Sequence, residues 1–361
     1  MGRRTVAILF GGRSSEHGIS CVTAGGVLGA IDRDRWNVLS IGITPDGQWT
    51  LVADDPEALA ITEGGLPQVA ESADTVLPPL RTGHGWRLLR EDGTHDELGH
   101  VDVVLPLLHG PFGEDGTLQG LLEMVDVRYV GAGVLASAAG MDKAFTKLVL
   151  AHAGLPVAHG VVLEPGTDWS ARRAEIEALG LPVFVKPARA GSSIGVSRVA
   201  SWEGLDAALA TAAKSDPKVL VEAAVPGREI ECGVLVRDGE VLTSPLGEIE
   251  AGGEHDFYDF DAKYLDEASV TLTCPVDLPE SLTATVHDFA RRAFVALGCE
   301  SLARVDCFVG EDGVVVNEVN TMPGFTPFSM YPRMWATAGI EYSELLDVLL
   351  EGALDRPVGL R

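Results

Sequence analysis

The stretch of sequence that decides the fold is LARVDCFVGEDGVVVNEVN, which runs from Leu302 to Asn320. Apolar and polar residues alternate on both sides of the segment 311–313, whose letters are EDG. Two alternating runs joined by a short glycine-containing segment predict a β-hairpin with a three-residue turn. In that register Gly310 pairs with Val314, and every other pair follows from it.

The predicted register gathers four polar side chains on one face of the hairpin. Arg304 lies opposite Asn320 and Asp306 lies opposite Glu318, because residues two apart along a strand point the same way. Two carboxylates and an amide oxygen form a hard-oxygen ligand set, which suits Mg²⁺ or Mn²⁺. Spacing alone also allows a solvated face with an internal salt bridge. A register shift of one residue would move these side chains to different faces of the hairpin. The same register places four side chains on the opposite face: Val305, Cys307, Asn317 and Val319.

A glycine-rich loop lies upstream in Lys186–Gly195 (KPARAGSSIG), between two runs that predict strands. Its backbone N–H groups are suited to cradling phosphate oxygens, as in anion-binding nests. It is not a Walker loop, because no G-K-[ST] follows the glycines. A plain connection between two strands explains the same letters, so the loop alone does not establish a phosphate site.

A third candidate is Gly11–Glu16 (GGRSSE), which follows the apolar run Thr5–Phe10 and precedes a predicted helix over Ile19–Ile31. Open α/β sheets bind small ligands at this place, where a strand ends and a helix begins. Glu16 suits an ammonium group of a ligand. It equally suits a helix-start carboxylate that interacts with the helix dipole.

A competing motif is Gly131–Ala136 (GAGVLA), which matches the dinucleotide fingerprint G-x-G-x-x-A. The fingerprint needs an acidic residue about 20 positions further on. Here the segment His152–Gly154 stands there instead. A NAD-binding Rossmann protein therefore remains the alternative from a different functional class.

The organisation of the chain changes near Gly131. Residues 1–130 alternate strand-like and helix-like segments, which predicts an open parallel sheet. Residues 53–98 are rich in Gly, Pro and Asp and predict an irregular surface excursion with a hairpin near Trp86. Later segments are strand-rich, a loop rich in acidic and aromatic residues is predicted over 248–266, and the chain from Ser329 is predicted to be helical.

The composition excludes some classes of binding partner. The net charge is −26 and only six lysines are present, which argues against nucleic-acid and anionic-membrane binding. No apolar run approaches the roughly 20 residues of a membrane span. Five cysteines without a C-x-x-C motif indicate reduced thiols in a cytoplasmic enzyme.

Together the motifs resemble those of the D-alanine–D-alanine ligases of the ATP-grasp superfamily, over nearly the whole chain. Seven ordered stretches carry the resemblance: GGRSSEHGIS (11–20), HGPFGEDGTLQG (109–120), GAGVLASAAGMDK (131–143), VKPARAGSSIG (185–195), FYDFDAKY (257–264), ARVD (303–306) and NEVNTMPG (317–324).

The resemblance implies an α/β and α+β, three-domain ATP-grasp fold with an N-terminal open parallel-sheet domain. The expected domains are 1–131 (first D-alanine), 132–222 (glycine-rich loop) and 223–361 (metal site and lid). Two D-alanine molecules and ATP are the expected ligands, with two Mg²⁺ or Mn²⁺ ions. The resemblance further implies peptidoglycan synthesis in the cytoplasm and a homodimer.

The resemblance also implies residue roles. Lys143 and Lys186 would contact the α- and β-phosphates, Lys263 the γ-phosphate, and Glu222 and Glu229 the adenine amino group and the ribose. The remaining assignments are these: Ser193 and Phe257 at the nucleotide; Asp306, Glu318 and Asn320 on the metals; Glu16 on the first substrate's ammonium, linked to Ser192 and Tyr264, with His109 nearby; Arg304 and the Gly324 N–H on the oxyanion; Ser329 and Met330 on the second substrate's carboxylate.

Relatives that make D-alanyl-D-lactate replace the tyrosine at the position of Tyr264, so its presence implies an amine acceptor. The segment 248–266 would be a lid that keeps water from the acylphosphate. A ligase of the same fold that uses D-serine or D-lactate is the alternative within the family. A non-catalytic ATP-binding regulator fits less well, because the whole metal and lysine set is present.

Overall fold

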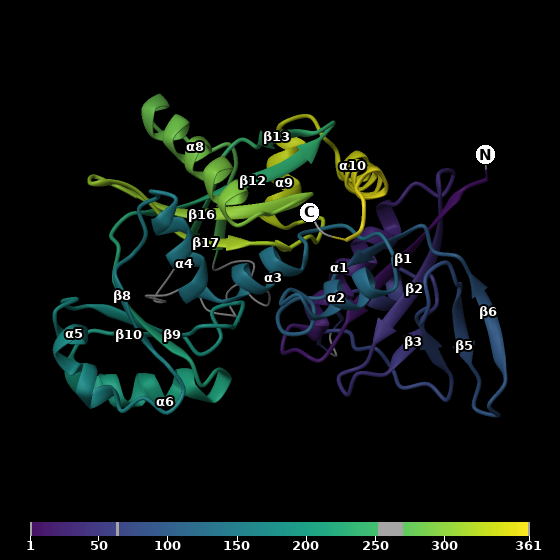
Figure 1. Ribbon diagram of the computed structural model, residues 1–361. Helices are drawn as coiled ribbons and strands as arrows, with labels where there is room; N and C mark the ends of the chain where they lie inside the picture. Colours follow the sequence, from purple (N-terminus) through teal and green to yellow (C-terminus); the bar gives the residue numbers. More distant parts are fainter. Residues whose placement is uncertain (1, 63–64, 252–269, 360–361) are drawn as a thin grey trace.

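The computed structural model describes residues 2–62, 65–251 and 270–359. Figure 1 shows three bodies around a common centre: an N-terminal sheet, a small central sheet below α4, and a large sheet topped by α8. The strands of the described residues form four sheets.

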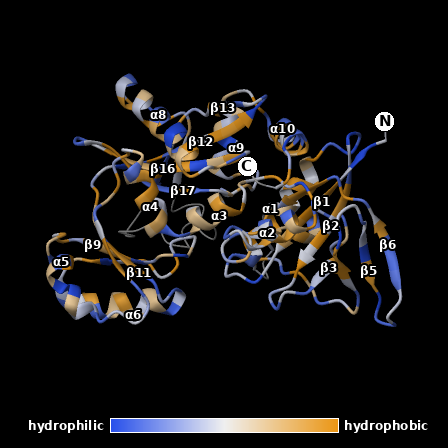
Figure 2. Ribbon diagram, viewed as in Figure 1, coloured by the Kyte–Doolittle hydropathy of each residue, from blue (hydrophilic) through white to orange (hydrophobic). Residues whose placement is uncertain are grey.

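The first sheet has the strand order β3-β2-β1-β7. β1 is parallel to β2 and to β7, and only the edge strand β3 is antiparallel. The middle strand is apolar along its length because both of its faces are covered, and Figure 2 shows β1 and β2 as largely hydrophobic. The predicted open parallel sheet is confirmed. Its elements are β1 (Arg4–Gly11), α1 (His17–Ala30), β2 (Trp36–Ile43), β3 (Trp49–Leu51), β7 (Val103–Pro106) and α2 (Thr117–Met124).

The predicted irregular excursion is more regular than its composition indicates. The hairpin near Trp86 is confirmed, and a third strand extends it to an antiparallel sheet in the order β4-β5-β6. The Trp86 ring is buried and lies 6.0 Å, centroid to centroid, from the ring of Trp49 on the first sheet. This contact buries one face of the small sheet, which the polar composition of the segment did not predict. The elements are η1 (Glu57–Leu59), β4 (Thr75–Leu77), β5 (Trp86–Leu89) and β6 (His95–Gly99).

The central sheet is antiparallel, with the order β10-β9-β11-β8. The helix α6 covers it, and the glycine-rich loop joins β9 to β10. Its elements are β8 (Gly160–Leu163), η2 (Trp169–Arg172), α5 (Arg173–Glu177), β9 (Val183–Pro187), β10 (Ser197–Val199), η3 (Trp202–Gly204), α6 (Leu205–Ser215) and β11 (Val219–Ala223).

The large sheet has the order β15-β14-β12-β16-β17, and β13 pairs with β12. The helices α3 and α4 pack on β17, and α8 packs across β12, β16 and β17. The predicted loop at 248–266 is wrong at its start, since Glu248 lies in β14 and pairs with Thr273 of β15. The elements are α3 (Val134–Met141), α4 (Lys143–His152), β12 (Arg228–Arg237), β13 (Glu240–Thr243), β14 (Gly247–Ala251), β15 (Val270–Thr273), α8 (Glu280–Ala296), β16 (Leu302–Gly310), β17 (Gly313–Asn320), α9 (Met330–Thr337) and α10 (Tyr342–Asp355).

The β16–β17 hairpin exists, but its turn is shorter than predicted. Gly310 pairs with Gly313, so the turn holds two residues and the strands next to it are one residue out of the expected register. A β-bulge between the pairs Cys307–Val316 and Asp306–Glu318 inserts one residue, Asn317, and restores the expected pairing beyond it. A bulge sets two residues of one strand against one of its partner.

The bulge also corrects the predicted position of Asn317. The regular alternation placed this residue on the face opposite to Glu318, but as the inserted residue of the bulge it lies outside the paired positions, and it lines the same cleft as Glu318. Asp306 and Glu318 are therefore paired as predicted, but the bulge, and not regular alternation from the turn, produces the pairing.

The last helix belongs to the core of the first sheet. Leu345 and Leu349 of α10 are buried in one apolar cluster with Val6 and Ile8 of β1. Figure 1 shows α10 beside the N-terminal sheet, far along the chain from it. No helix among the described residues is long and apolar enough to cross a membrane.

Candidate active site

The predicted motifs meet at one cleft of about 1100 Å³, which the first, central and large sheets all border. Three predicted residues, Phe257, Lys263 and Tyr264, lie outside the described residues, as does most of the proposed lid. All the other predicted residues line the cleft: Glu16, His109, Lys143, Lys186, Ser192, Ser193, Glu222, Glu229, Arg304, Asp306, Glu318, Asn320, Gly324, Ser329 and Met330.

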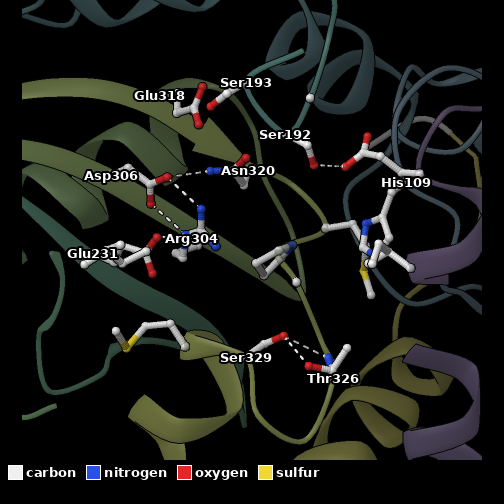
Figure 3. A pocket seen from close by; sticks show the side chains of 18 of the residues that line it. His109, Ser192, Ser193, Glu231, Arg304, Asp306, Glu318, Asn320, Thr326 and Ser329 are labelled. Atoms are coloured by element: carbon white, nitrogen blue, oxygen red, sulfur yellow. Dashed lines mark hydrogen bonds and ion pairs between the residues drawn. The ribbon is translucent and has the colours of Figure 1, made fainter. Parts of the chain in front are cut away.

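The centre of the cleft floor is the Arg304–Asp306 pair of β16 (Figure 3). Arg304 donates from Nε to Oδ1 of Asp306 at 2.7 Å and from Nη2 to Oδ2 at 2.8 Å. Asn320 of β17 adds a hydrogen bond to Oδ2 at 2.9 Å. Asp306 is only 1% exposed. A carboxylate held by three donors has a defined orientation, as a metal ligand requires.

Glu231 of β12 completes this network, and sequence reasoning missed it. Its Oε1 lies 3.1 Å from Nε of Arg304, and it pairs in the sheet with Asp306. Burial opposes the charge of Arg304, but the carboxylates of Asp306 and Glu231 hold the pKa of this guanidinium well above its ordinary value. A signal was available, because Glu231 stands two residues after the predicted ligand Glu229 and so shares its face.

The N-terminal motif and the glycine-rich loop meet across 176 residues of chain, since Ser192 donates a hydrogen bond from its hydroxyl to Oε1 of Glu16. Glu16 stands at the N-cap of α1, but its side chain makes no cap hydrogen bond. The helix-start interpretation is thus right about its position, and the carboxylate is in addition an acceptor for Ser192. Ser192 and Ser193 have φ of +48° and +57°, and this left-handed backbone brings the serine hydroxyls to the cleft.

Two further buried groups surround Glu16. His109 is buried, and its Nε2 has no hydrogen-bond partner among the described residues. Burial lowers the pKa of His109, although Glu16 opposes this. Glu114, which sequence reasoning did not single out, accepts a hydrogen bond from the Gly110 N–H at 2.7 Å. Burial, and then the Glu16 carboxylate, raise the pKa of Glu114 to about 8.

Lysine side chains reach the cleft from α4 and β9. Lys186 forms an ion pair with Oε2 of Glu222. Lys143 donates to the Ala190 carbonyl at 2.9 Å, and its Nζ lies 3.4 Å from Oε2 of Glu318. Burial pushes the pKa of Glu222 up, but the ammonium groups of Lys186 and Lys147 hold it below its ordinary value. Three ammonium groups therefore lie beside two carboxylates at the glycine-rich loop, in a chain that is acidic overall.

The base of that loop is tied to its surroundings. The Ala188 N–H donates to the Lys218 carbonyl at 2.9 Å, and the Ala188 carbonyl accepts from the Lys143 N–H at 2.9 Å. Arg189 donates from its backbone N–H and its guanidinium to the carboxylate of Asp216. The loop is therefore fixed at its first residues, Ala188 and Arg189.

The far end of the cleft is a turn before α9. Ser329 accepts a hydrogen bond at Oγ from the Thr326 N–H at 3.1 Å, and its Oγ lies 2.7 Å from that of Thr326. Ser329 is the N-cap of α9, although its hydroxyl does not cap the helix. A helix N-terminus with a hydroxyl beside it is suited to a carboxylate ligand.

The donor set at the hairpin fits a divalent cation. No group of three His, Cys, Asp and Glu side chains comes together as a metal site among the described residues. Asp306, Glu318 and Asn320 instead supply two carboxylates and one amide from paired strands. Mg²⁺ sites of this kind use one or two carboxylates and leave the other positions to water and phosphate oxygens.

The dinucleotide interpretation of residues 131–136 is wrong. The helix α3 does begin after Gly133, as the motif requires. A Cβ placed on Gly133 would lie 3.4 Å from Oε2 of Glu300, whose carboxylate pairs with Arg356. The glycine at the start of α3 therefore faces a carboxylate, which repels phosphate, and the helix packs on β17 of the large sheet.

Two sheets face one cleft: an antiparallel sheet with a glycine-rich loop, and a larger sheet whose hairpin carries the carboxylates. An open parallel-sheet domain borders the same cleft. This arrangement defines an ATP-grasp protein. The sequence model of the D-ala D-ala ligase N-terminus matches residues 5–132, and that of the C-terminus matches residues 149–351. The chain belongs to the D-alanine–D-alanine ligase family, whose members are ADP-forming ligases.

Relatives match over almost their whole length. The chain is 60% identical to a D-alanine–D-alanine ligase of Kineococcus radiotolerans, with 99% of this chain and 98% of the relative covered. It is 54% identical to one of Mycolicibacterium smegmatis, with 100% and 98% covered. Among solved structures, a D-Ala:D-Ser ligase from Enterococcus faecalis has a TM-score of 0.82 at 34% identity, covering 98% of this chain and 100% of that one. The D-alanine–D-alanine ligase of Coxiella burnetii has a TM-score of 0.81 at 34% identity, with 99% and 95% covered.

Proposed function

We propose that this chain joins two D-alanine molecules into D-alanyl-D-alanine for peptidoglycan synthesis, with ATP as the energy source and an acylphosphate as the intermediate. The observation that carries the proposal is the single cleft that unites the Glu16–Ser192 contact with the Arg304–Asp306–Asn320 network. A site for an amino acid and a site for phosphate and metal thus share one volume.

The nucleotide would lie between the central and large sheets. Lys143 and Lys186 would contact the α- and β-phosphates, Glu222 the adenine amino group and Glu229 the ribose. Lys263, Ser193 and Phe257 would also contact the nucleotide. Two Mg²⁺ or Mn²⁺ ions, held by Asp306, Glu318 and Asn320, would offset the charge of the phosphates.

In the first step a carboxylate oxygen of D-alanine attacks the γ-phosphorus, and the bond to ADP breaks. Glu16 would hold the ammonium group of this substrate, with Ser192 and Tyr264 fixing the carboxylate of Glu16. His109 offers its open Nε2 to the same substrate. Positioning and charge neutralisation carry this step, because the protein forms no covalent bond.

In the second step the amine of the other D-alanine attacks the acyl carbon, and phosphate leaves. Arg304 and the Gly324 N–H would stabilise the tetrahedral oxyanion. Ser329, by its hydroxyl, and Met330, by its backbone, would place the carboxylate of the second substrate. The part of the segment 248–266 that follows β14 would act as a lid and exclude water, which otherwise destroys the acylphosphate.

The test incubates the purified chain with D-alanine, Mg²⁺ and ATP, and measures ADP, phosphate and dipeptide together. Equal amounts of the three products are expected. Release of ADP and phosphate without dipeptide, or no release at all, would refute the proposal. The resemblance to the D-Ala:D-Ser ligase makes D-serine and D-lactate the necessary competitors, and D-alanyl-D-alanine is expected to remain the main product in their presence.

We also infer a homodimer, a cytoplasmic location and the three domains 1–131, 132–222 and 223–361. Met124 of α2 and Leu135 of α3 are 84% and 79% exposed, and exposed apolar side chains on adjacent helices favour a protein contact. Light scattering on the purified protein measures the oligomeric state.

A further inference from the structure

Lys147 is a buried lysine beside the cleft that the roles above do not use. It follows Lys143 by one turn of α4, is 8% exposed, and is absent from the cleft lining that the described residues form. A buried lysine must be paired, because an isolated ammonium in the interior is strongly unfavourable. Its partners therefore indicate what it does.

The Lys147 ammonium has one partner in each of two sheets. Its Nζ lies 2.7 Å from Oε1 of Glu222 in β11 of the central sheet, and it donates to the carbonyl of Asn317 in β17 at 3.2 Å. Figure 1 shows α4 between these two sheets. Lys147 thus connects the sheet that carries the glycine-rich loop to the hairpin that carries the metal ligands.

The Asn317 carbonyl is available because of the bulge. Asn317 is the inserted residue, which lies outside the paired positions of the β16–β17 ladder. Val316 next to it donates its N–H to the carbonyl of Pro156, in the segment that follows α4, at 2.8 Å. The bulge therefore turns a backbone acceptor toward α4 without disturbing the Asp306–Glu318 pair.

Glu222 is shared by two lysines. Its Oε2 pairs with Lys186, and its Oε1 pairs with Lys147. Burial lowers the pKa of Lys147, and the Glu222 carboxylate opposes this shift. If Lys186 were the sole partner of Glu222, moving Lys186 to a phosphate would leave a 2%-exposed carboxylate unpaired, which costs heavily.

We propose that Lys147 is a positioning residue of the nucleotide site: it keeps Glu222 neutralised and holds the two sheets together, so that Lys186 can leave Glu222 for a phosphate oxygen. This inference rests on the proposed ATP-dependent function. Lys147 acts through Glu222 and does not itself touch the nucleotide.

The test measures the affinity of the full-length chain for ADP with Mg²⁺ by isothermal titration calorimetry. Lys147→Met is expected to weaken ADP binding about 10- to 100-fold, because Lys186 is then retained by Glu222. The same substitution is expected to raise the KM for ATP and not the KM for D-alanine. Lys214→Met, at an exposed lysine of α6, is the matched control and is expected to bind ADP as the unmodified chain does.

A second comparison removes the partner of Lys147. The double variant Lys147→Met, Glu222→Gln is expected to bind ADP within about threefold of Glu222→Gln alone, because the effect of Lys147 passes through the Glu222 charge. This pair of variants also carries the test if Lys147→Met alone does not fold, since both buried charges are removed together.

Two results would overturn the inference. One is an unchanged ADP affinity in Lys147→Met. The other is a double variant that binds ADP far more weakly than Glu222→Gln, which would mean direct contact or a general role in folding. ADP titration needs no turnover, so a failure to make dipeptide would refute the proposed function and leave this measurement to decide the role of Lys147.

Discussion

Arg304 is the residue on which the proposed chemistry depends most. Its two hydrogen bonds to Asp306 and its contact with Glu231 use the planar fork of the guanidinium, which lysine does not reproduce. The side chain is thus shared between orienting a metal ligand and stabilising an oxyanion.

Arg304→Lys is expected to lower kcat about 10²- to 10³-fold, the cost of losing one oxyanion donor. The substitution also removes hydrogen bonds from the buried Asp306 carboxylate, so the melting temperature is expected to fall as well. Initial rates of ADP release at saturating D-alanine measure the effect, and a kcat within about threefold of the unmodified chain would contradict the assignment.

Glu114 makes folding depend on pH. Its pKa is raised from 4.5 to about 8 in the folded chain, so the folded state binds the proton more tightly than the unfolded state. This group therefore stabilises the fold less as pH rises through that window, by at most about 1.4 kcal/mol per pH unit.

Glu114→Gln removes the titration. Between pH 5 and 9 its melting temperature is expected to fall less steeply than that of the unmodified chain, measured by calorimetry in buffers of equal ionic strength. Parallel curves for the two proteins would show that Glu114 titrates normally.

At the scale of elements, the β16–β17 hairpin shows how local sequence signals and register can disagree. The turn is one residue shorter than predicted, and the Asn317 bulge compensates for the difference. Gly313 begins β17 with φ of +114°, and nothing lies within 4 Å of a Cβ placed on it. Any cost of an alanine there comes from the backbone alone.

Gly313→Ala is expected to lower the free energy of unfolding by about 1–2 kcal/mol, because an L-residue is strained at positive φ. Gly352→Ala in α10 is the matched control, since a Cβ there also meets nothing within 4 Å. It is expected to raise stability by about 0.5–1 kcal/mol, as alanine is the better helix former. Urea unfolding measures both, and equal effects would refute the backbone explanation.

At the scale of the whole molecule, the two ends of the chain share a core. The helix α10 packs against β7 and shares an apolar cluster with β1, and Trp36 of β2 donates from Nε1 to Asp347 of α10 at 2.8 Å. The parallel sheet that presents Glu16 therefore depends on residues more than 300 positions away.

Leu346→Ala, at a fully buried site of α10, is expected to destabilise the fold by about 2–5 kcal/mol through the cavity that it leaves. Because the core is shared, hydrogen exchange should rise in β1 as well as in α10. Exchange that rises in α10 alone would show that the helix unfolds independently of the first sheet.

Much of the fold and of the candidate site could be predicted from the sequence. Apolar runs of period two and of helical spacing predicted the central strands and helices to within a few residues, because backbone conformation follows from neighbouring side chains. The site residues followed from the ordered motifs, and all of those within the described residues lie at one cleft. The prediction of an irregular segment over residues 53–98 was wrong, because Trp86 there is buried against Trp49 of another sheet.

By itself, then, the sequence determined the order of most elements, the family and the motifs whose described residues lie at the cleft. Only the tertiary structure decided which of them touch: Ser192 with Glu16, Lys147 with Glu222, and the Asn317 carbonyl with Lys147. The reason is physical. A strand or a turn is specified within a few residues, whereas a bulge or a shared buried charge depends on packing between segments that the chain separates widely. Only three of the six lysines were assigned a role from the sequence, and packing added Lys147 to the same site.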